Sequence, residues 1–91
     1  MKVQKAVQIF KEYHKSILKD STTKSYGYVL IYLGALFGDR NIESIKQDDI
    51  FQFMELITEN QAHGTKHLRF AQLKAFFNFC RNKFDVDFKN P

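Results

Sequence analysis

Five basic residues and no carboxylate lie between Ala62 and Phe84 of this 91-residue chain. They are Lys66, Arg69, Lys74, Arg81 and Lys83. Lysine and arginine side chains without nearby counter-charges bind phosphate groups, and arginine can also donate two hydrogen bonds to guanine. The segment therefore indicates a polyanionic partner, of which nucleic acid is the commonest. Taken alone, it is explained equally well as the solvated basic face of a helix.

A second candidate for phosphate binding is the polar run Ser21-Thr22-Thr23-Lys24-Ser25. It offers hydroxyl groups, backbone amides and one cation, which are the groups that contact the phosphates of nucleic acids. The same residues would serve as the N-cap and polar first turn of a helix. Taken alone, this run is better interpreted as a helix start than as a binding site.

The other reactive side chains form no recognisable catalytic or metal site. The four tyrosines, Tyr13, Tyr26, Tyr28 and Tyr32, have no base, metal or arginine pair placed by sequence to activate them. His63 and His67 are four residues apart and could share a helix face, but a zinc site needs further ligands. The single Cys80 excludes an internal disulfide. We therefore expect no catalytic residue, no metal, no cofactor and no small-molecule substrate.

Length and composition favour one small domain that spans residues 1–91. Ten phenylalanines and no tryptophan make phenylalanine a main component of the core. The first residues contain no apolar segment of the kind found in signal peptides, and the longest apolar run, 26–37, is too short to cross a bilayer. We expect a soluble, cytoplasmic domain without a membrane partner.

Apolar residues recur every three or four positions in four stretches, and no alternating strand pattern is present. The spacing predicts an all-α fold with helices over about 3–19, 20–37 and 47–59. A fourth helix is expected after a cap at Gly64 or Thr65. In the first three helices the inner apolar stripes are Val3, Ala6, Val7, Phe10, Tyr13, Ile17 and Leu18, then Tyr26, Val29, Leu30, Leu33, Leu36 and Phe37, then Ile50, Phe53, Met54 and Ile57.

Several turn and packing features follow from the same pattern. Gly27 and Gly34, seven residues apart, are expected to allow a close helix approach, and Gly38 to end its helix in the left-handed conformation. Ile42 and Ile45 should tuck the connection against the core. The fourth helix has a polar strip of only His67, Lys74, Asn78 and Arg81, so we expect it to be the central helix of the bundle.

Charge alternates in blocks along the chain. Residues 1–38 carry a net charge of +4, residues 39–61 carry −4, and residues 62–84 carry +5. Phosphates repel the acidic block, so we expect the third helix to face away from any nucleic acid.

The order of landmarks along the chain is more specific than any single one. A Ser/Thr cluster opens a helix, and the landmarks that follow are Tyr26, Leu33, Phe37, Ile42, Ile45, Asp49-Ile50, Phe53, Ile57, Gly64-Thr65, Arg69, the run 71–79 and Asn90-Pro91. This order resembles the N-terminal core-binding domain, also called SAM-like, of tyrosine recombinases of the phage integrase type. The resemblance covers about residues 9–91. Lys46 departs from the pattern, because the family often has Ser or Thr as the cap there.

The resemblance implies a small orthogonal bundle of four main helices that forms one half of a clamp around duplex DNA. It implies that the second and fourth helices approach the major groove. The DNA-binding residues would then be Thr22, Thr23, Lys24, Lys66, His67, Arg69 and Lys74. The first helix is the candidate contact with a neighbouring recombinase protomer on the DNA.

The catalytic set of the family cannot be placed in this sequence. That set is an Arg, a Lys, a His-x-x-Arg, a further His or Trp, and a Tyr nucleophile, and His67-Leu68-Arg69 does not match it. The resemblance therefore implies a domain that binds DNA without cutting it, with the catalytic domain after Pro91 in a longer protein. Two other functions stay open, a helical protein–protein interaction module and a helix-turn-helix regulator. The intervals between the expected helices are long for the latter.

Overall fold

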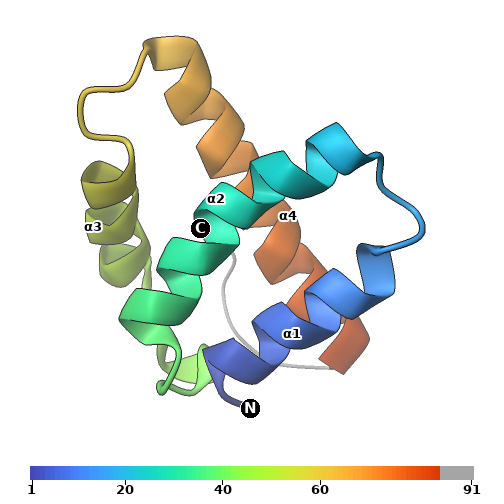
Figure 1. Cartoon of the computed structure of the whole chain (residues 1–91). Coiled ribbons are helices and arrows are strands. Elements are labelled where there is room, and N and C mark those ends of the chain that lie inside the picture. Colours follow the sequence, from blue (N-terminus) through green and yellow to red (C-terminus); the bar gives the residue numbers. More distant parts are fainter. Residues whose placement is uncertain (85–91) are drawn as a thin grey trace.

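The structure is a computed structural model, which describes residues 1–84, and the secondary-structure elements within them are all helices (Figure 1). The elements are α1 (Val3–His14), α2 (Asp20–Phe37), the 3-10 turn η1 (Ile42–Ser44), α3 (Gln47–Ile57) and α4 (His63–Phe84). The predicted all-α fold is confirmed. The Asn90-Pro91 landmark lies outside the described residues.

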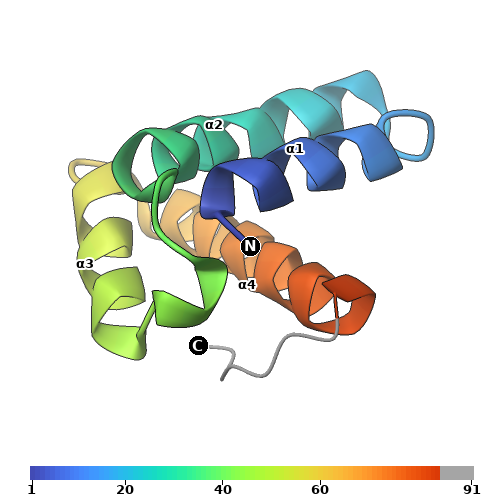
Figure 2. The same cartoon turned by 90° about the horizontal axis from the view of Figure 1, so that it is seen from below.

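The four helices pack as a small bundle. α1 and α2 lie side by side, α4 packs across both of them, and α3 packs against α2 and α4 at one end (Figures 1 and 2). This confirms the predicted bundle of four main helices. Within residues 1–84, no helix is both long and apolar enough to cross a membrane.

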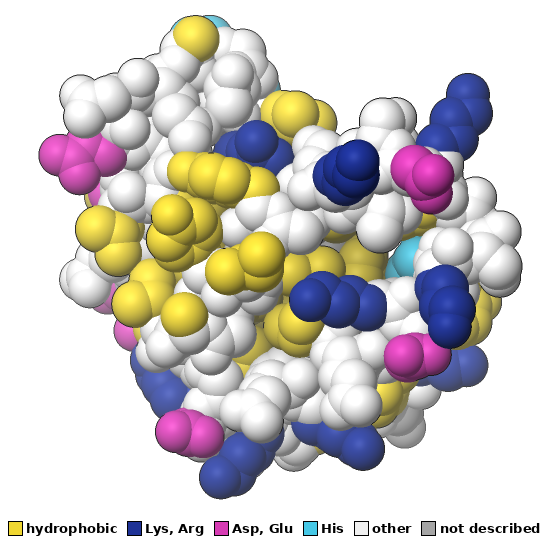
Figure 3. All heavy atoms as spheres, in the orientation of Figure 1, with side chains coloured by type: hydrophobic (Ala, Val, Ile, Leu, Met, Phe, Trp, Pro, Cys, Tyr) yellow, Lys and Arg dark blue, Asp and Glu magenta, His cyan; other side chains and the backbone are white. Residues whose placement is uncertain are grey.

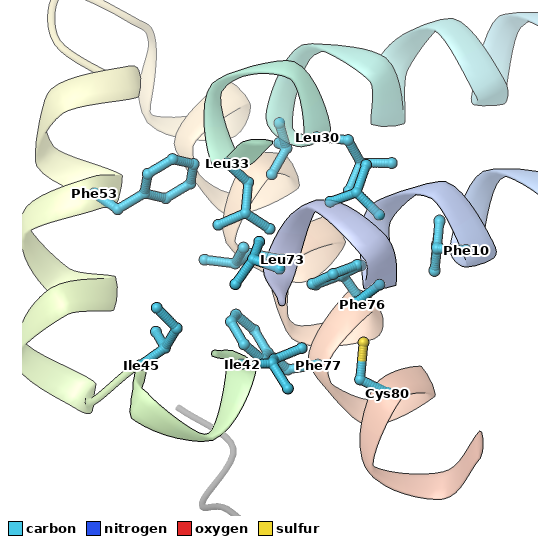
Figure 4. Packing of buried hydrophobic residues seen from close by; sticks show 14 of the residues in the cluster. Phe10, Leu30, Leu33, Ile42, Ile45, Phe53, Leu73, Phe76, Phe77 and Cys80 are labelled. Atoms are coloured by element: carbon cyan, nitrogen blue, oxygen red, sulfur yellow. The ribbon is translucent and has the colours of Figure 1, made fainter. Parts of the chain in front are cut away.

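The hydrophobic core joins all of these elements. Its buried members are Val3, Ala6, Val7 and Phe10 of α1, Val29, Leu30 and Leu33 of α2, Ile42 and Ile45 of the connection, Ile50, Phe53 and Ile57 of α3, and Leu73, Phe76, Phe77 and Cys80 of α4 (Figure 4). The ring of Phe76 meets the rings of Phe10 and Phe77 edge to face, with centroids 5.5 and 5.4 Å apart. Burial raises the pKa of the Cys80 thiol to about 12, so Cys80 is an unreactive core residue.

The beginning of the chain is hydrogen-bonded to the connection between α2 and α3. The amide of Val3 donates to the carbonyl of Arg40 at 2.9 Å, and the amide of Ile42 donates to the carbonyl of Met1 at 2.8 Å. These bonds hold η1 against α1. Ile42 is fully buried and Ile45 nearly so, which confirms that the connection is tucked against the core.

Two predictions about the ends and faces of the first two helices were wrong. α1 ends at His14 instead of Lys19, and Ile17 in the following turn is 64% exposed. Tyr13 and Leu36, predicted on inner stripes, are 49% and 47% exposed. Apolar spacing identifies the side of a helix that could be buried. It does not tell how far along the helix its neighbours cover that side.

The predictions for three glycines were also wrong. Gly38 has φ −54° and ψ −37°, which is right-handed instead of left-handed. Gly38 has little room for a side chain, because a Cβ there would collide with the backbone carbonyl of Gly34. At Gly27 and Gly34 a Cβ would meet no atom within 4 Å, so neither glycine mediates a close helix approach.

Asp49 organises the start of α3 despite the missing Ser or Thr cap. Its Oδ2 accepts a hydrogen bond from the backbone amide of Lys46 at 2.9 Å and another from Nη2 of Arg40 at 3.2 Å. The amide bond is the main cause, and the guanidinium the next, of a pKa for Asp49 below its ordinary value. As predicted, Asp48 and Asp49 lie in the first turn of α3.

The lowered pKa of Asp49 gives a prediction about stability and pH. Its ionised form stabilises the fold at pH values above the unfolded-state pKa, about 3.9. That contribution disappears as the pH falls through the lower folded-state pKa. The stability difference between the wild type and Asp49→Asn should therefore be constant above pH ~5 and shrink below ~4. Urea unfolding between pH 2 and 7 measures it. Asp48→Asn is the control, since within residues 1–84 no hydrogen bond or ion pair involves its carboxylate.

Candidate nucleic-acid interface

The first half of α4 extends beyond the hydrophobic core. The helix begins at His63, ahead of the predicted cap at Gly64 or Thr65. Leu68 and Phe70 are 47% and 43% exposed, whereas the buried apolar residues of α4 begin at Leu73. The prediction of a central helix therefore holds only for the second half of α4. The first half is a surface element that carries exposed cations.

A hollow separates this first half of α4 from the start of α2. We call it the α2–α4 hollow, and its lining residues are Ser21, Thr22, Ser25, Tyr26, Leu68, Ala71 and Gln72. Figure 3 shows a notch between these two segments, with lysine or arginine atoms and hydrophobic atoms on its walls. The two segments that the sequence marked separately as phosphate-binding candidates therefore lie next to each other.

The exposed residues Lys66, His67, Ala71 and Lys74 form what we call the ridge of α4, which reaches the α2–α4 hollow at Ala71. Ala71 lines this hollow on one side, and on the other it lines a wider groove between α3 and α4 together with Lys66, His67 and Lys74. Lys66, His67 and Lys74 are exposed. In residues 1–84 the ion pairs join the N-terminal amine to Glu43 and Arg40 to Asp49, so neither Lys66 nor Lys74 has a salt-bridge partner there. Both lysines are free to meet an anion.

The charge blocks of the sequence do not form separate faces. Glu55 of α3 and Glu59 in the turn after it line the same groove as Lys66, His67 and Lys74 of α4. The orientation of the acidic third helix away from nucleic acid stays a prediction, and these two glutamates lie beside basic residues. Opposite charges can share one groove although they lie in different blocks, because a turn brings consecutive helices together.

The remaining candidates on α2 are divided between faces. Thr22 is partly buried and lines the α2–α4 hollow. Thr23 and Lys24 are exposed and are not among the lining residues. Successive helical residues are about 100° apart, so these two side chains leave α2 on other sides. The structure brings Thr22 to the first half of α4 and leaves Thr23 and Lys24 apart from it.

Arg69 is engaged inside the protein. Its Nη1 donates to the carbonyl of Ser25 at 2.8 Å and to Oε1 of Gln72 at 3.1 Å. Its guanidinium carbon lies 4.2 Å from the ring centre of Tyr28, which is a cation–π contact. Among the seven predicted DNA-binding residues, Arg69 is the one whose charged group binds other parts of the chain within residues 1–84.

Gln72 and Tyr28 had no assigned role in the sequence. Gln72 is 5% exposed, and its Nε2 donates to the hydroxyl of Ser25 at 2.7 Å. The Tyr28 hydroxyl donates to the carbonyl of Ile57 at 2.7 Å. The run 71–79 contains three polar residues, Gln72, Lys74 and Asn78, so its pattern did not single out Gln72 as the buried one. The partner of Gln72 is 47 residues away, and no local pattern identifies such a partner.

No group of three or more metal-ligating side chains forms within the part of the chain that the structure describes. His63 and His67 lie with ring centroids 4.9 Å apart, so they share a helix face as predicted. Together the exposed cations, hydroxyl groups and hollow form a surface that can hold phosphates and neighbouring groups.

Comparison of the chain with models of protein families, with curated proteins and with solved structures found no match.

Proposed function

We propose that this domain binds duplex DNA through the start of α2 and the exposed first half of α4. The observation that carries the proposal is the α2–α4 hollow, which Thr22, Leu68 and Ala71 line. Ala71 also lines the adjoining groove of Lys66 and Lys74, neither of which has a salt-bridge partner within residues 1–84. Hydroxyl and ammonium groups would contact phosphates. Small apolar groups such as the Ala71 methyl would contact base edges.

The start of α2 adds backbone donors to this surface. The N-cap residue Lys19 makes no side-chain capping bond, so the first amides of the helix are without a side-chain partner. Such amides favour phosphate oxygens, and the helix dipole adds to the attraction. Asp20 in the same turn opposes this attraction, which is why we assign the main charge contribution to α4.

The order of landmarks supports a more specific proposal. In it the domain is the core-binding half of a tyrosine recombinase clamp, contacts neighbouring protomers on DNA, and acts in the cytoplasm. In this proposal the domain binds DNA and has no catalytic residues of its own. The four-helix bundle agrees with this proposal but is too common an architecture to prove it.

The direct test is the salt dependence of duplex binding. About four to six phosphate contacts would give a slope of log K against log [salt] of roughly −4 to −5. Fluorescence anisotropy of a labelled duplex of random sequence, titrated at several salt concentrations, measures this slope. Absence of binding at about 50 mM salt would refute the proposal.

Exposed apolar surface favours one alternative, a helical protein-interaction module. Phe51 and Leu56 of α3 are 66% and 56% exposed, and Ile31 and Tyr32 of α2 are 64% and 43% exposed. Figure 3 shows hydrophobic atoms gathered over the second half of α2 and the adjoining side of α3. Such patches mark interaction sites. Binding to a protein through this surface would be nearly independent of salt, which separates the two functions.

A further inference from the structure

Arg69 belongs to a polar cluster that joins three segments of the fold. We define the Arg69 cluster as Ser25 and Tyr28 of α2, Gln61 before α4, and Arg69 and Gln72 of α4. Beyond the contacts of Arg69 itself, Nε2 of Gln61 donates to the Tyr28 hydroxyl at 2.7 Å. Tyr28 therefore contacts Arg69 through its ring and Gln61 through its hydroxyl. The cluster links α2 with the beginning and the middle of α4.

The Arg69 cluster contacts α4 just before the part of the helix that is buried in the apolar core. The buried apolar residues of α4 begin at Leu73, and Leu68 and Phe70 on the first half are exposed. Within residues 1–84, the side-chain hydrogen bonds between the start of α2 and this half of α4 all involve Ser25 with Arg69 or Gln72. The width of the α2–α4 hollow therefore depends on these polar contacts, because Ser25 and Gln72 also line it.

We propose that Arg69 is a positioning residue for DNA binding, an inference that rests on the proposed function. It fixes the distance between the start of α2 and the ridge of α4 before DNA arrives, so that both reach the duplex together. A guanidinium that is stacked on Tyr28 and bonded to Ser25 and Gln72 is not available as a counter-charge for a phosphate. Preorganisation strengthens binding by removing the cost of ordering the surface during association.

Two variants separate positioning from a direct phosphate contact. Arg69→Met removes the charge and the hydrogen bonds, and Arg69→Lys keeps the charge but loses the planar fork of donors. Positioning predicts that both variants bind a random-sequence duplex about tenfold more weakly at every salt concentration. The slope of log K against log [salt] should stay unchanged, because no phosphate contact is lost. Lys66→Met is the matched control and should lower the slope by about 0.9.

The opposite pattern would overturn the inference. If Arg69 contacts a phosphate, Arg69→Met lowers the slope by about 0.9 and Arg69→Lys restores both slope and affinity. Wild-type affinity in both variants would also overturn it. Ser25→Ala is a milder variant, which is used if substitutions of Arg69 unfold the protein. It removes only the hydroxyl group that accepts hydrogen bonds from Arg69 and Gln72. It should give a smaller loss of affinity with the same unchanged slope, and an unchanged affinity would count against the proposal.

Hydrogen exchange of the free protein tests the cluster without DNA. In Arg69→Met, the amides of residues 66–70 should exchange about tenfold faster, whereas those of residues 6–10 in α1 should not change. Equal exchange in the variant and the wild type would overturn the inference. If the wild type binds no duplex, the proposed function fails. Exchange alone then decides whether Arg69 holds α4 in place, with faster exchange supporting this role.

Discussion

Reversing the charges of Lys66 and Lys74 together should weaken duplex binding about a hundredfold at 0.1 M salt. At this salt concentration, counterion release at each phosphate contact raises the binding constant by a factor of about 10^0.9. The variant loses two such contacts. The salt slope should fall by about 1.8. Both lysines are exposed, and neither makes an ion pair within residues 1–84, so the fold should not be affected.

The control for this double variant is Lys5→Glu with Lys11→Glu. These lysines are exposed on α1, away from the first half of α4 (Figure 1), and the net charge changes by the same amount. Their reversal should reduce affinity only through the weak long-range field. Anisotropy titrations of the two double variants and the wild type measure the difference. Equal losses in both variants would refute the assigned face and leave a general charge effect.

Phe76→Ala should destabilise the domain by about 3–5 kcal/mol. Phe76 is fully buried, and its ring packs edge to face against Phe10 and Phe77. Truncation removes those contacts and leaves a cavity at the junction of α1 and α4. Domains of this kind are stable by about 5–15 kcal/mol in total, so the change removes a large fraction of the stability. Urea unfolding followed by circular dichroism measures it.

Phe70→Ala is the matched control for the core prediction, since it makes the same chemical change on the same helix. Phe70 is 43% exposed at the edge of the groove between α3 and α4. Its truncation should change stability by less than about 1 kcal/mol. Comparable losses at both positions would mean that the first half of α4 is packed as firmly as the second half. That result would contradict the division of α4 described above.

The sequence was sufficient to predict the fold class and most of the core. The stripe of Val3, Ala6, Val7 and Phe10 is buried as its spacing indicates, and the pair Ile42 and Ile45 is buried between helices. These features depend on local periodicity and burial, which a single sequence displays directly. The starts of α2 and α3 were also predicted within about one residue.

The candidate site was less accessible to sequence reasoning. The sequence marked Thr22 and Lys66 by type, and the structure brings their segments together. It marked Arg69 in the same way, although this guanidinium binds Ser25 44 residues earlier. Whether a cation faces solvent or another part of the chain depends on tertiary packing. One sequence contains no direct record of that packing.

The continuity of α4 has a mechanical consequence. One helix carries the proposed binding ridge on its first half and core residues such as Phe76 on its second half. About 20 Å of helix separates Phe76 from His63, at 1.5 Å per residue. If α4 pivots as a rigid helix about its buried half, a tilt of about 5° would move its first turn by about 1.7 Å. That displacement is enough to break a hydrogen bond. A force that displaces Phe84 would therefore also displace the ridge of α4, because no loop interrupts the helix between them.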